Sequence, residues 1–282
     1  MARYATRIDL RQAALAISVL IDLDLDPHAD GVLVSGVPPV LVGWRECRTA
    51  LRGASPDTAQ GRTLLARWLL RRRWIADHTF DDLAERSRPV GLPPRHALHP
   101  GADWVCKSII GSSLDLGLGF RGVQPGHPDR VIIVPHGVLT ASGTDMGAFW
   151  KRATAYLEQM GELAVARWRR DRGAVVRPMG DCDVVTLLGS RTFRWAVTAE
   201  DPHGMRAAVV PMRTRGWLDV SRIDPAFGPA AARATDAVDR GFARPVLITV
   251  DEVSVVAPGG RPQAALDDPA PARNWLRPLL YR

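Results

Sequence analysis

The sequence predicts an α+β fold: a mixed or antiparallel sheet, a long covering helix and a mostly helical N-terminal segment. Two observations carry this prediction. Apolar residues recur at helical spacing through most of the chain before about residue 100, whereas alternation of period two appears only later, at residues 114–120. The length of 282 residues suits one large domain or two smaller ones, and either can bury a substantial core.

The composition is that of an ordinary globular protein, because 46% of the residues are apolar and 24% are charged. The net charge of +7 comes almost wholly from arginine, since Lys107 and Lys151 are the only lysines. A GC-rich genome produces the same preference for arginine, so the charge alone does not indicate nucleic-acid binding. It still favours anionic partners through the long-range field of the protein.

The three cysteines are widely spaced and contain no Cys-x-x-Cys pair, which argues against a disulfide framework or a zinc ribbon. They are Cys47, Cys106 and Cys182. This usage favours a reducing, cytoplasmic setting. No run of about 18 apolar residues is present, so we expect no membrane span.

In the N-terminal segment, Asp9 is expected to cap a first helix that ends near Asp24. The predicted buried stripe of this helix is Leu10, Ala13, Ala14, Ile17 and Leu20. Residues 31–42 are expected to form one or two short strands broken by Pro38 and Pro39. Helices are predicted at residues 44–51, 57–76 and 79–86.

Residues 88–101 contain four prolines, which restrict the backbone and remove hydrogen-bond donors, so we expect irregular structure there. This stretch is the predicted internal boundary. It divides a segment of residues 1–100 from an α+β body of residues 101–257, and the two are expected to be able to share one core. A Pro-rich tail follows at residues 258–282.

The body begins with a predicted helix at residues 102–110 and a strand at 114–120, in which Leu114, Leu116, Leu118 and Phe120 alternate with small or polar residues. An apolar strand at residues 131–134 completes a long hairpin with it. The other predicted elements are a long helix at 145–171, strands at 175–176, 205–212 and 244–256, the last bent at Asp251 and Glu252, and a helical piece within 218–238.

The tail ends in a cluster of large apolar residues that a disordered segment would not normally carry: Trp275, Leu276, Leu279, Leu280 and Tyr281. We therefore expect the tail to dock on the body or on another subunit.

Residues 117–122 match the letters of the dinucleotide-binding pattern Gly-x-Gly-x-x-Gly. That pattern functions only when its glycines open a helix whose N–H groups meet a pyrophosphate. Here the glycines lie within a strand pattern and precede a Pro-rich loop, so we interpret them as positions of close backbone approach. No cofactor follows from them.

The stretch of residues 177–188 places two carboxylates and a thiol where an apolar element begins: Asp181, Cys182 and Asp183. If residues 184–197 are helical, Asp181 or Asp183 is the N-cap, and the helix dipole lowers the pKa of the thiol while the adjacent carboxylates oppose that effect. If Gly189 and Ser190 form a hairpin turn, the same residues are two strands. The capping aspartate and the missing alternation favour the helix.

The first functional hypothesis is a non-enzymatic binding or assembly protein that engages an acidic protein surface or nucleic acid. Guanidinium groups pair with phosphates, and indole rings stack on bases or on arginine. Its candidate residues are Arg67, Arg71, Arg72, Arg73 and Trp74, then Arg167, Arg169 and Arg170, and Trp275 and Tyr281 in the tail. Solvated arginines over buried tryptophans are the alternative interpretation of both helices.

The second hypothesis is a hydrolase- or transferase-like enzyme with Cys182 as its nucleophile. His136 or His99 would act as the base, and Asp181 or Asp183 would orient that base. A metal-dependent variant would use His96, His99 and Asp183 as ligands. Because His96 and His99 lie in a Pro-rich loop, ordinary loop histidines are the competing interpretation.

Overall fold

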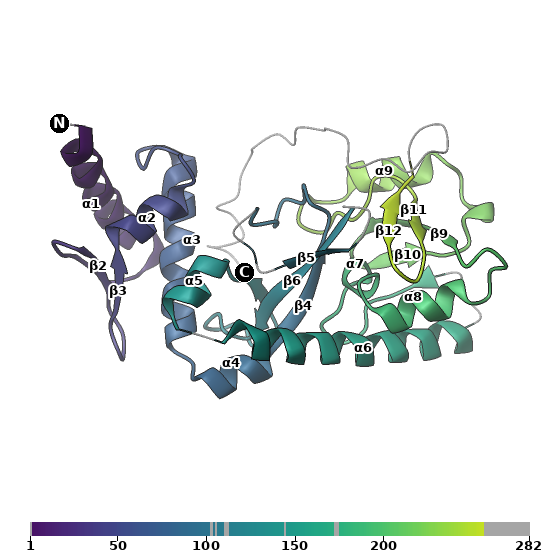
Figure 1. Cartoon of the computed structure of the whole chain (residues 1–282). Helices are drawn as coiled ribbons and strands as arrows, with labels where there is room; N and C mark the ends of the chain where they lie inside the picture. Colours follow the sequence, from purple (N-terminus) through teal and green to yellow (C-terminus); the bar gives the residue numbers. More distant parts are fainter. Residues whose placement is uncertain are drawn as a thin grey trace.

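The computed structural model describes residues 2–101, 104, 106–109, 113–143, 145–171 and 175–256, with only the backbone described for residues 2–9, 106–109 and 222. These residues form helices and three sheets in which every pairing is antiparallel, which confirms the α+β prediction (Figure 1). None of the described helices is long and apolar enough to cross a bilayer. The tail with Trp275 and Tyr281 lies outside the described residues.

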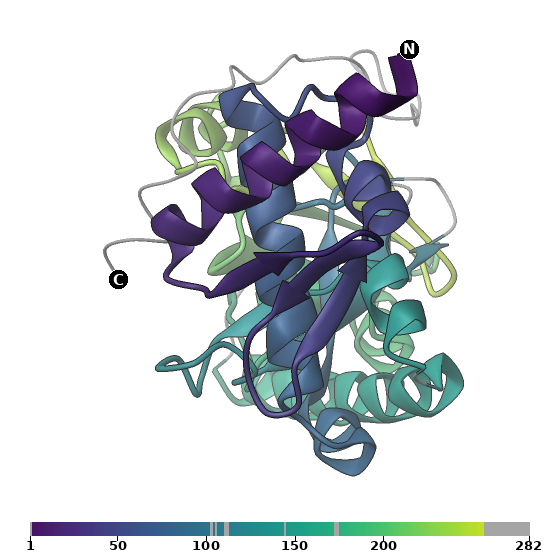
Figure 2. The same ribbon diagram turned by 90° about the vertical axis from the view of Figure 1, so that its left-hand side faces the viewer.

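The N-terminal segment is a small layered unit of helices and one sheet. Its helices are α1 (Ala2–Ile21), α2 (Trp44–Leu51), α3 (Ala59–Ala76) and α4 (Phe80–Arg86), and its strands are β1 (Leu25–Pro27), β2 (Gly31–Val34) and β3 (Val40–Gly43). Helix α1 crosses α3, and the three strands lie below it (Figure 2). The predicted helices and the strand break at Pro38 are confirmed, whereas β1 was not predicted.

Two details of α1 were predicted incorrectly. Asp9 lies inside the helix, so it does not cap it. The stripe from Leu10 to Ile17 is buried as expected, but Leu20 is 55% exposed. The helix therefore presents a narrower buried face than its apolar composition indicates.

The predicted irregular segment begins as a strand. β4 (Ser87–Leu92) pairs along the whole of β6 (Leu114–Arg121), with Pro89 opposite Leu118. Pro89 is tolerated because β4 is an edge strand and its missing N–H lies on the outer side, two residues before that of Gly91. The prolines do restrict the backbone here, as predicted. The prediction of irregular structure missed that an edge strand can accommodate Pro89.

The other side of β6 is shared by two strands. β5 (Cys106–Ile109) pairs with its first half, so the predicted helix at residues 102–110 is wrong. β7 (Val131–Ile133) pairs with its second half, which confirms the predicted hairpin. Both faces of β6 are buried, whereas the alternation predicted one.

The two faces of β6 meet different surroundings. Large side chains such as Leu118 and Phe120 enter a core that runs from Leu10 in α1 to Ala153 in α6 (Met146–Arg170), so the N-terminal segment and the body share buried contacts. The division of the chain into three segments stays a prediction. On the opposite face Gly117 lies under the ring of Trp104, whose Nε1 donates to Leu118 O at 2.9 Å.

Helix α6 is the predicted long covering helix. Asp145 caps it, and it runs beneath β4 and α8 (Figure 1). The remaining helices are α5 (His136–Ala141), α7 (Val184–Leu187), α8 (Arg191–Thr198) and α9 (Phe227–Ala234), with a 3₁₀ turn at Val220–Arg222. The second sheet has the order β12 (Val253–Val255), β11 (Val246–Ile248), β9 (Arg206–Met212), β10 (Arg215–Trp217) and β8 (Val175–Val176).

Residues 184–197 are helical, and the hairpin alternative is wrong. The helix is divided in two at Gly189, because Asp183 caps α7 and Ser190 caps α8 through its hydroxyl. Of the two predicted caps, Asp183 is therefore confirmed and Asp181 is not.

Gly117→Ala should lower the free energy of unfolding by about 1–3 kcal/mol, because the added methyl group overpacks a filled site. A Cβ at this position would lie 2.2 Å from an atom of the Trp104 ring. Urea unfolding measures the change. The control is Gly43→Ala, where the nearest atom is 3.8 Å away, and we expect a change within about 0.5 kcal/mol. Equal stability of the two variants would contradict the packing of Trp104 on β6.

Candidate functional site

The stretch of residues 177–188 leads from β8 into α7 and lines a small pocket of about 160 Å³. The pocket lies between α3, the strands β4 and β7, and the start of α7. Its charged and hydroxyl-bearing lining residues are Arg71, Arg130, Asp181, Asp183, Thr186 and Arg213. Its apolar lining comes from Pro89, Val90, Leu98 and residues 131–133.

Asp183 is fully engaged on one side of the pocket. Its Oδ1 accepts the Thr186 N–H at 2.7 Å, which is the cap of α7. Its Oδ2 accepts from Arg213 Nε at 2.6 Å and lies 2.5 Å from Arg213 Nη2. Both side chains are mostly buried, so this charge pair fixes the β9–β10 turn to the start of α7.

Asp181 is held by a second group of partners. Its Oδ2 accepts from Arg88 Nε at 2.6 Å and from the Tyr156 hydroxyl at 3.3 Å, and Arg121 Nε lies 3.5 Å from Oδ1. The Arg88 guanidinium also lies 4.5 Å from the centre of the Tyr156 ring. Neither aspartate of the pocket is therefore free to orient a histidine.

Cys182, between the two aspartates, points into the core and has no exposed surface. Burial raises the pKa of its thiol, and the charges of Asp183 and Asp181 raise it further. Within the described chain, no histidine is among the groups that shift this pKa or bond to the thiol. A nucleophile needs a thiolate and a base within reach, and this arrangement supplies neither.

Neither His136 nor His99 is placed to act as a base for Cys182. His136 is exposed in the first turn of α5, with Nε2 3.3 Å from the Thr140 hydroxyl. His99 Nδ1 accepts the Gly101 N–H at 2.9 Å, so its Nε2 carries the hydrogen that Asp115 accepts at 3.0 Å. Among the residues that the structure describes, no three His, Cys, Asp or Glu side chains could hold a metal ion, so the set of His96, His99 and Asp183 is not assembled.

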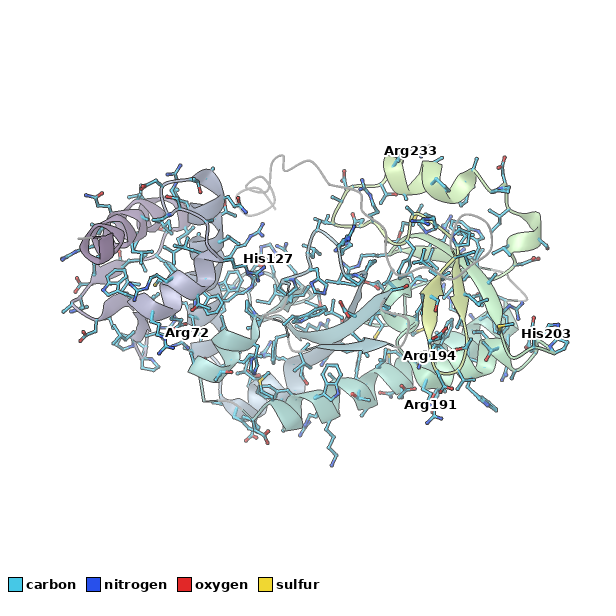
Figure 3. All side chains as sticks on the ribbon, turned by 45° about the horizontal axis from the view of Figure 1, so that its top comes forward. Arg72, His127, Arg191, Arg194, His203 and Arg233 are labelled. Atoms are coloured by element: carbon cyan, nitrogen blue, oxygen red, sulfur yellow. The ribbon has the colours of Figure 1, made fainter. Side chains whose placement is uncertain are left out.

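Two of the candidate partner-binding arginines of α3 are structural. Arg72 Nε lies 2.9 Å from Glu46 Oε1, and its Nη1 donates to the Ser142 hydroxyl at 2.8 Å. Arg73 donates to Pro38 O at 2.6 Å and pairs with Asp77. Both are buried. They connect α3 to α2, to the β2–β3 loop and to the end of α5, and they offer no surface to a partner (Figure 3 labels Arg72).

Most of the indole rings of α3 and α6 belong to the buried core. Trp68 is buried and donates to Glu46 at 2.7 Å, Trp74 is partly buried, and Trp168 is buried under Arg206. At the end of α6, Arg167 and Arg170 pair with Asp171 at 3.6 and 3.1 Å. The interpretation of solvated arginines over buried tryptophans therefore describes α6 better than a stacking platform does.

A larger hollow of about 430 Å³ lies between the β2–β3 hairpin, the end of α3 and α5. Its polar groups already have partners. Ser142 donates to Val138 O at 2.9 Å, and His78 Nδ1 lies 2.7 Å from Trp74 O. The Arg72 side chain that lines the hollow is held by its ion pair with Glu46, so the hollow is a weaker candidate for a ligand site than the smaller pocket.

The exception is a group of four guanidinium groups that we call the arginine cluster: Arg52, Arg67, Arg71 and Arg130. Burial, together with the charges of Arg67, Arg52 and Arg130, lowers the pKa of Arg71 to about 10. No carboxylate contributes to this change. The Arg71 Nε is buried and has no hydrogen-bond partner among the described residues, whereas Arg52 and Arg130 are exposed.

Sequence reasoning identified Arg67 and Arg71 but missed Arg52 and Arg130. The latter two come from the end of α2 and from the loop before β7, so no sequence spacing connects them to α3. The only available signal was their charge, and the sequence contains many other arginines.

His96 should make stability fall below neutral pH. Burial and the charges of Arg213, His99 and Arg240 lower its pKa to about 4, although the Arg240 backbone opposes this change. Between pH 6.5 and 4 the unfolded chain binds a proton that the folded protein does not, so protonation favours unfolding. The expected loss between pH 7 and pH 4.5 is about 2 kcal/mol from this residue.

His96→Asn isolates this contribution, because its side-chain oxygen can still accept the Leu98 N–H that His96 Nδ1 accepts at 3.0 Å. Urea unfolding at the two pH values should show a smaller loss in the variant. An identical pH dependence in the variant and the wild-type protein would contradict a neutral, buried His96.

Comparison with known proteins adds no function to this geometry. No protein-family model, no curated protein and no solved structure matches the chain. The pocket and the arginine cluster are therefore the features that bear on the function.

Proposed function

We propose that the protein is a non-enzymatic binding protein that engages an anionic partner, an acidic protein surface or nucleic acid, through the arginine cluster. One observation carries the proposal. Arg71 is half-buried beside the pocket, its buried Nε has no hydrogen-bond partner among the described residues, and burial together with the charges of Arg67, Arg52 and Arg130 lowers its pKa.

The electrostatics of Arg71 support a role in binding. Removing a cation from water costs several kcal/mol, and folded proteins normally offset that cost with a paired acid. Arg71 stays charged at neutral pH because its pKa is still about 10. Four guanidinium groups close together raise the local positive potential and attract anions. A partner's negative charge would offset the mutual repulsion of these guanidinium groups.

The kind of contact follows from what surrounds the cluster. The tryptophans Trp68 and Trp168 are buried, so base stacking on them is not available. Contacts would be made to charge, that is, to a phosphate backbone or to carboxylates, and would depend strongly on salt. The enzyme alternative receives no support from the described residues, because Cys182 is buried and Asp181 and Asp183 are already paired.

Arg71→Met should raise the free energy of unfolding by about 1 kcal/mol, because it replaces a half-buried cation, which three neighbouring guanidinium groups repel, with an apolar side chain. Arg72→Met is the matched control on the same helix. It leaves Glu46 without its ion-pair partner and should lower the free energy of unfolding by about 3 kcal/mol. Urea unfolding in a low-salt, anion-poor buffer measures both. A loss of stability in Arg71→Met would show that Arg71 has a stabilising partner and would remove the basis of the proposal.

Binding is tested with the full-length chain and a labelled DNA duplex as the polyanion, with polyglutamate as a competitor. The logarithm of the affinity should fall linearly with the logarithm of the salt concentration. The double variant Arg52→Gln/Arg130→Gln should lower the slope by about 1–2 and weaken binding at least tenfold. The control Arg169→Gln/Arg191→Gln removes the same charge from exposed positions on α6 and α8. A slope near zero, or an equal loss in both double variants, would contradict the assignment.

A further inference from the structure

The geometry points to the pocket beside Arg71 as a site for a phosphoryl group, held by Arg71, Arg130 and the Thr186 hydroxyl. This inference rests on the proposed function and deepens it, because it says which chemical group of the anionic partner is recognised. The pocket is formed by α3, β4, β7 and α7, so a ligand there would contact elements that are far apart in the sequence.

The size of the pocket limits the ligand. Nucleotide and cofactor sites typically occupy about 300–1,000 Å³, and this pocket measures about 160 Å³. A water molecule takes about 30 Å³ of liquid, so the pocket holds a group the size of a few waters. A single phosphoryl group fits that limit, whereas a whole nucleotide does not.

The floor of the pocket is apolar. Val90 and Val131 approach each other over Gly119, where an added Cβ would lie 2.8 Å from each side chain. Low polarity on one side of a charged ligand strengthens its interactions with the guanidinium groups, because less water competes for them. Gly119 therefore leaves room for Val90 and Val131 beside the pocket, and Gly117 leaves room for the Trp104 ring.

Thr186 supplies an unused donor. Its side chain is almost fully buried, and its Oγ1 accepts the Gly91 N–H at 2.8 Å. That bond uses a lone pair and leaves the hydroxyl hydrogen, for which the described residues provide no acceptor. A phosphoryl oxygen in the pocket is an acceptor of the required kind.

The charges that line the pocket favour a dianion. Asp183 is paired with Arg213, and Asp181 with Arg88, so the two carboxylates are neutralised within the protein. Among the described residues, no ion pair joins Arg71 or Arg130 to a carboxylate, and both arginines line the pocket. A phosphate monoester carries a charge of about −1.5 to −2 at neutral pH and can accept from both guanidinium groups. A carboxylate has a single charge and would leave one of the two uncompensated.

The test is calorimetric titration of the full-length chain with inorganic phosphate, and with acetate at the same ionic strength. Phosphate should bind saturably and at least tenfold more tightly than acetate. Arg130→Gln and Arg71→Gln should each weaken phosphate binding at least tenfold, and Arg169→Gln should leave it unchanged. Arg130 is exposed, so Arg130→Gln is expected to fold normally, which circular dichroism verifies.

Three outcomes would overturn the inference: no saturation, equal binding of phosphate and acetate, or binding that Arg130→Gln does not change. The duplex titration separates this failure from that of the proposed function. If the duplex still binds through Arg52 and Arg130 while phosphate fails to bind, only the phosphoryl site is wrong. If neither binds, the proposed function fails as well.

Discussion

The hydrogen bond from the Gly91 N–H to Thr186 Oγ1 fixes the start of α7 against the outer edge of β4, and the site depends on it. A strand edge presents donors that must find partners when they are buried. Here the first turn of α7 supplies the acceptor, and the contact is so close that a Cβ on Gly91 would lie 2.7 Å from Thr186 Cα. Once α7 is placed, its cap Asp183 can hold Arg213, and the pocket is the space that remains between these groups and α3.

The arginines of this protein divide into two kinds according to their surroundings. Most of the buried ones act as connectors between elements. Arg194, for example, donates to the carbonyl groups of Leu188, Gly189 and Val250, which ties the break between α7 and α8 to the turn between β11 and β12 (Figure 3). Arg71 is half-buried, and its Nε has no acceptor among the described residues. The surroundings of each arginine therefore say more about its role than the net positive charge of the chain does.

Much of the fold follows from local rules that the sequence obeys. Asp145 and Asp183 cap the helices predicted to follow them, and the alternation at residues 114–120 is a strand. The failures have a common cause, which is that the deciding contact is distant in the sequence. Pro89 is compatible with a strand only because β4 is an edge, and residues 106–109 are a strand because β6 offers them a partner.

The contacts that form the site are also distant in the sequence, so the site could not be predicted from local patterns. Adjacent residues on a helix point in directions about 100° apart, so Arg71, Arg72 and Arg73 must meet different neighbours. Periodicity does not say that Glu46 faces Arg72 or that Pro38 faces Arg73. The cap at Asp183 is local and could be predicted, whereas the cluster joins residues from α2, α3 and the loop before β7.

In the proposed function, binding and stability would be coupled at Arg71 by one physical quantity, the low polarity of its surroundings. The environment that makes an unpaired cation costly in the free protein also strengthens its attraction to an incoming anion. A ligand that binds only the folded state stabilises it by RT ln(1 + [L]/Kd), so an anion would offset the cost in proportion to its affinity. A chain that needed only stability would place an apolar residue at this position, and an arginine there is consistent with selection for an anionic ligand.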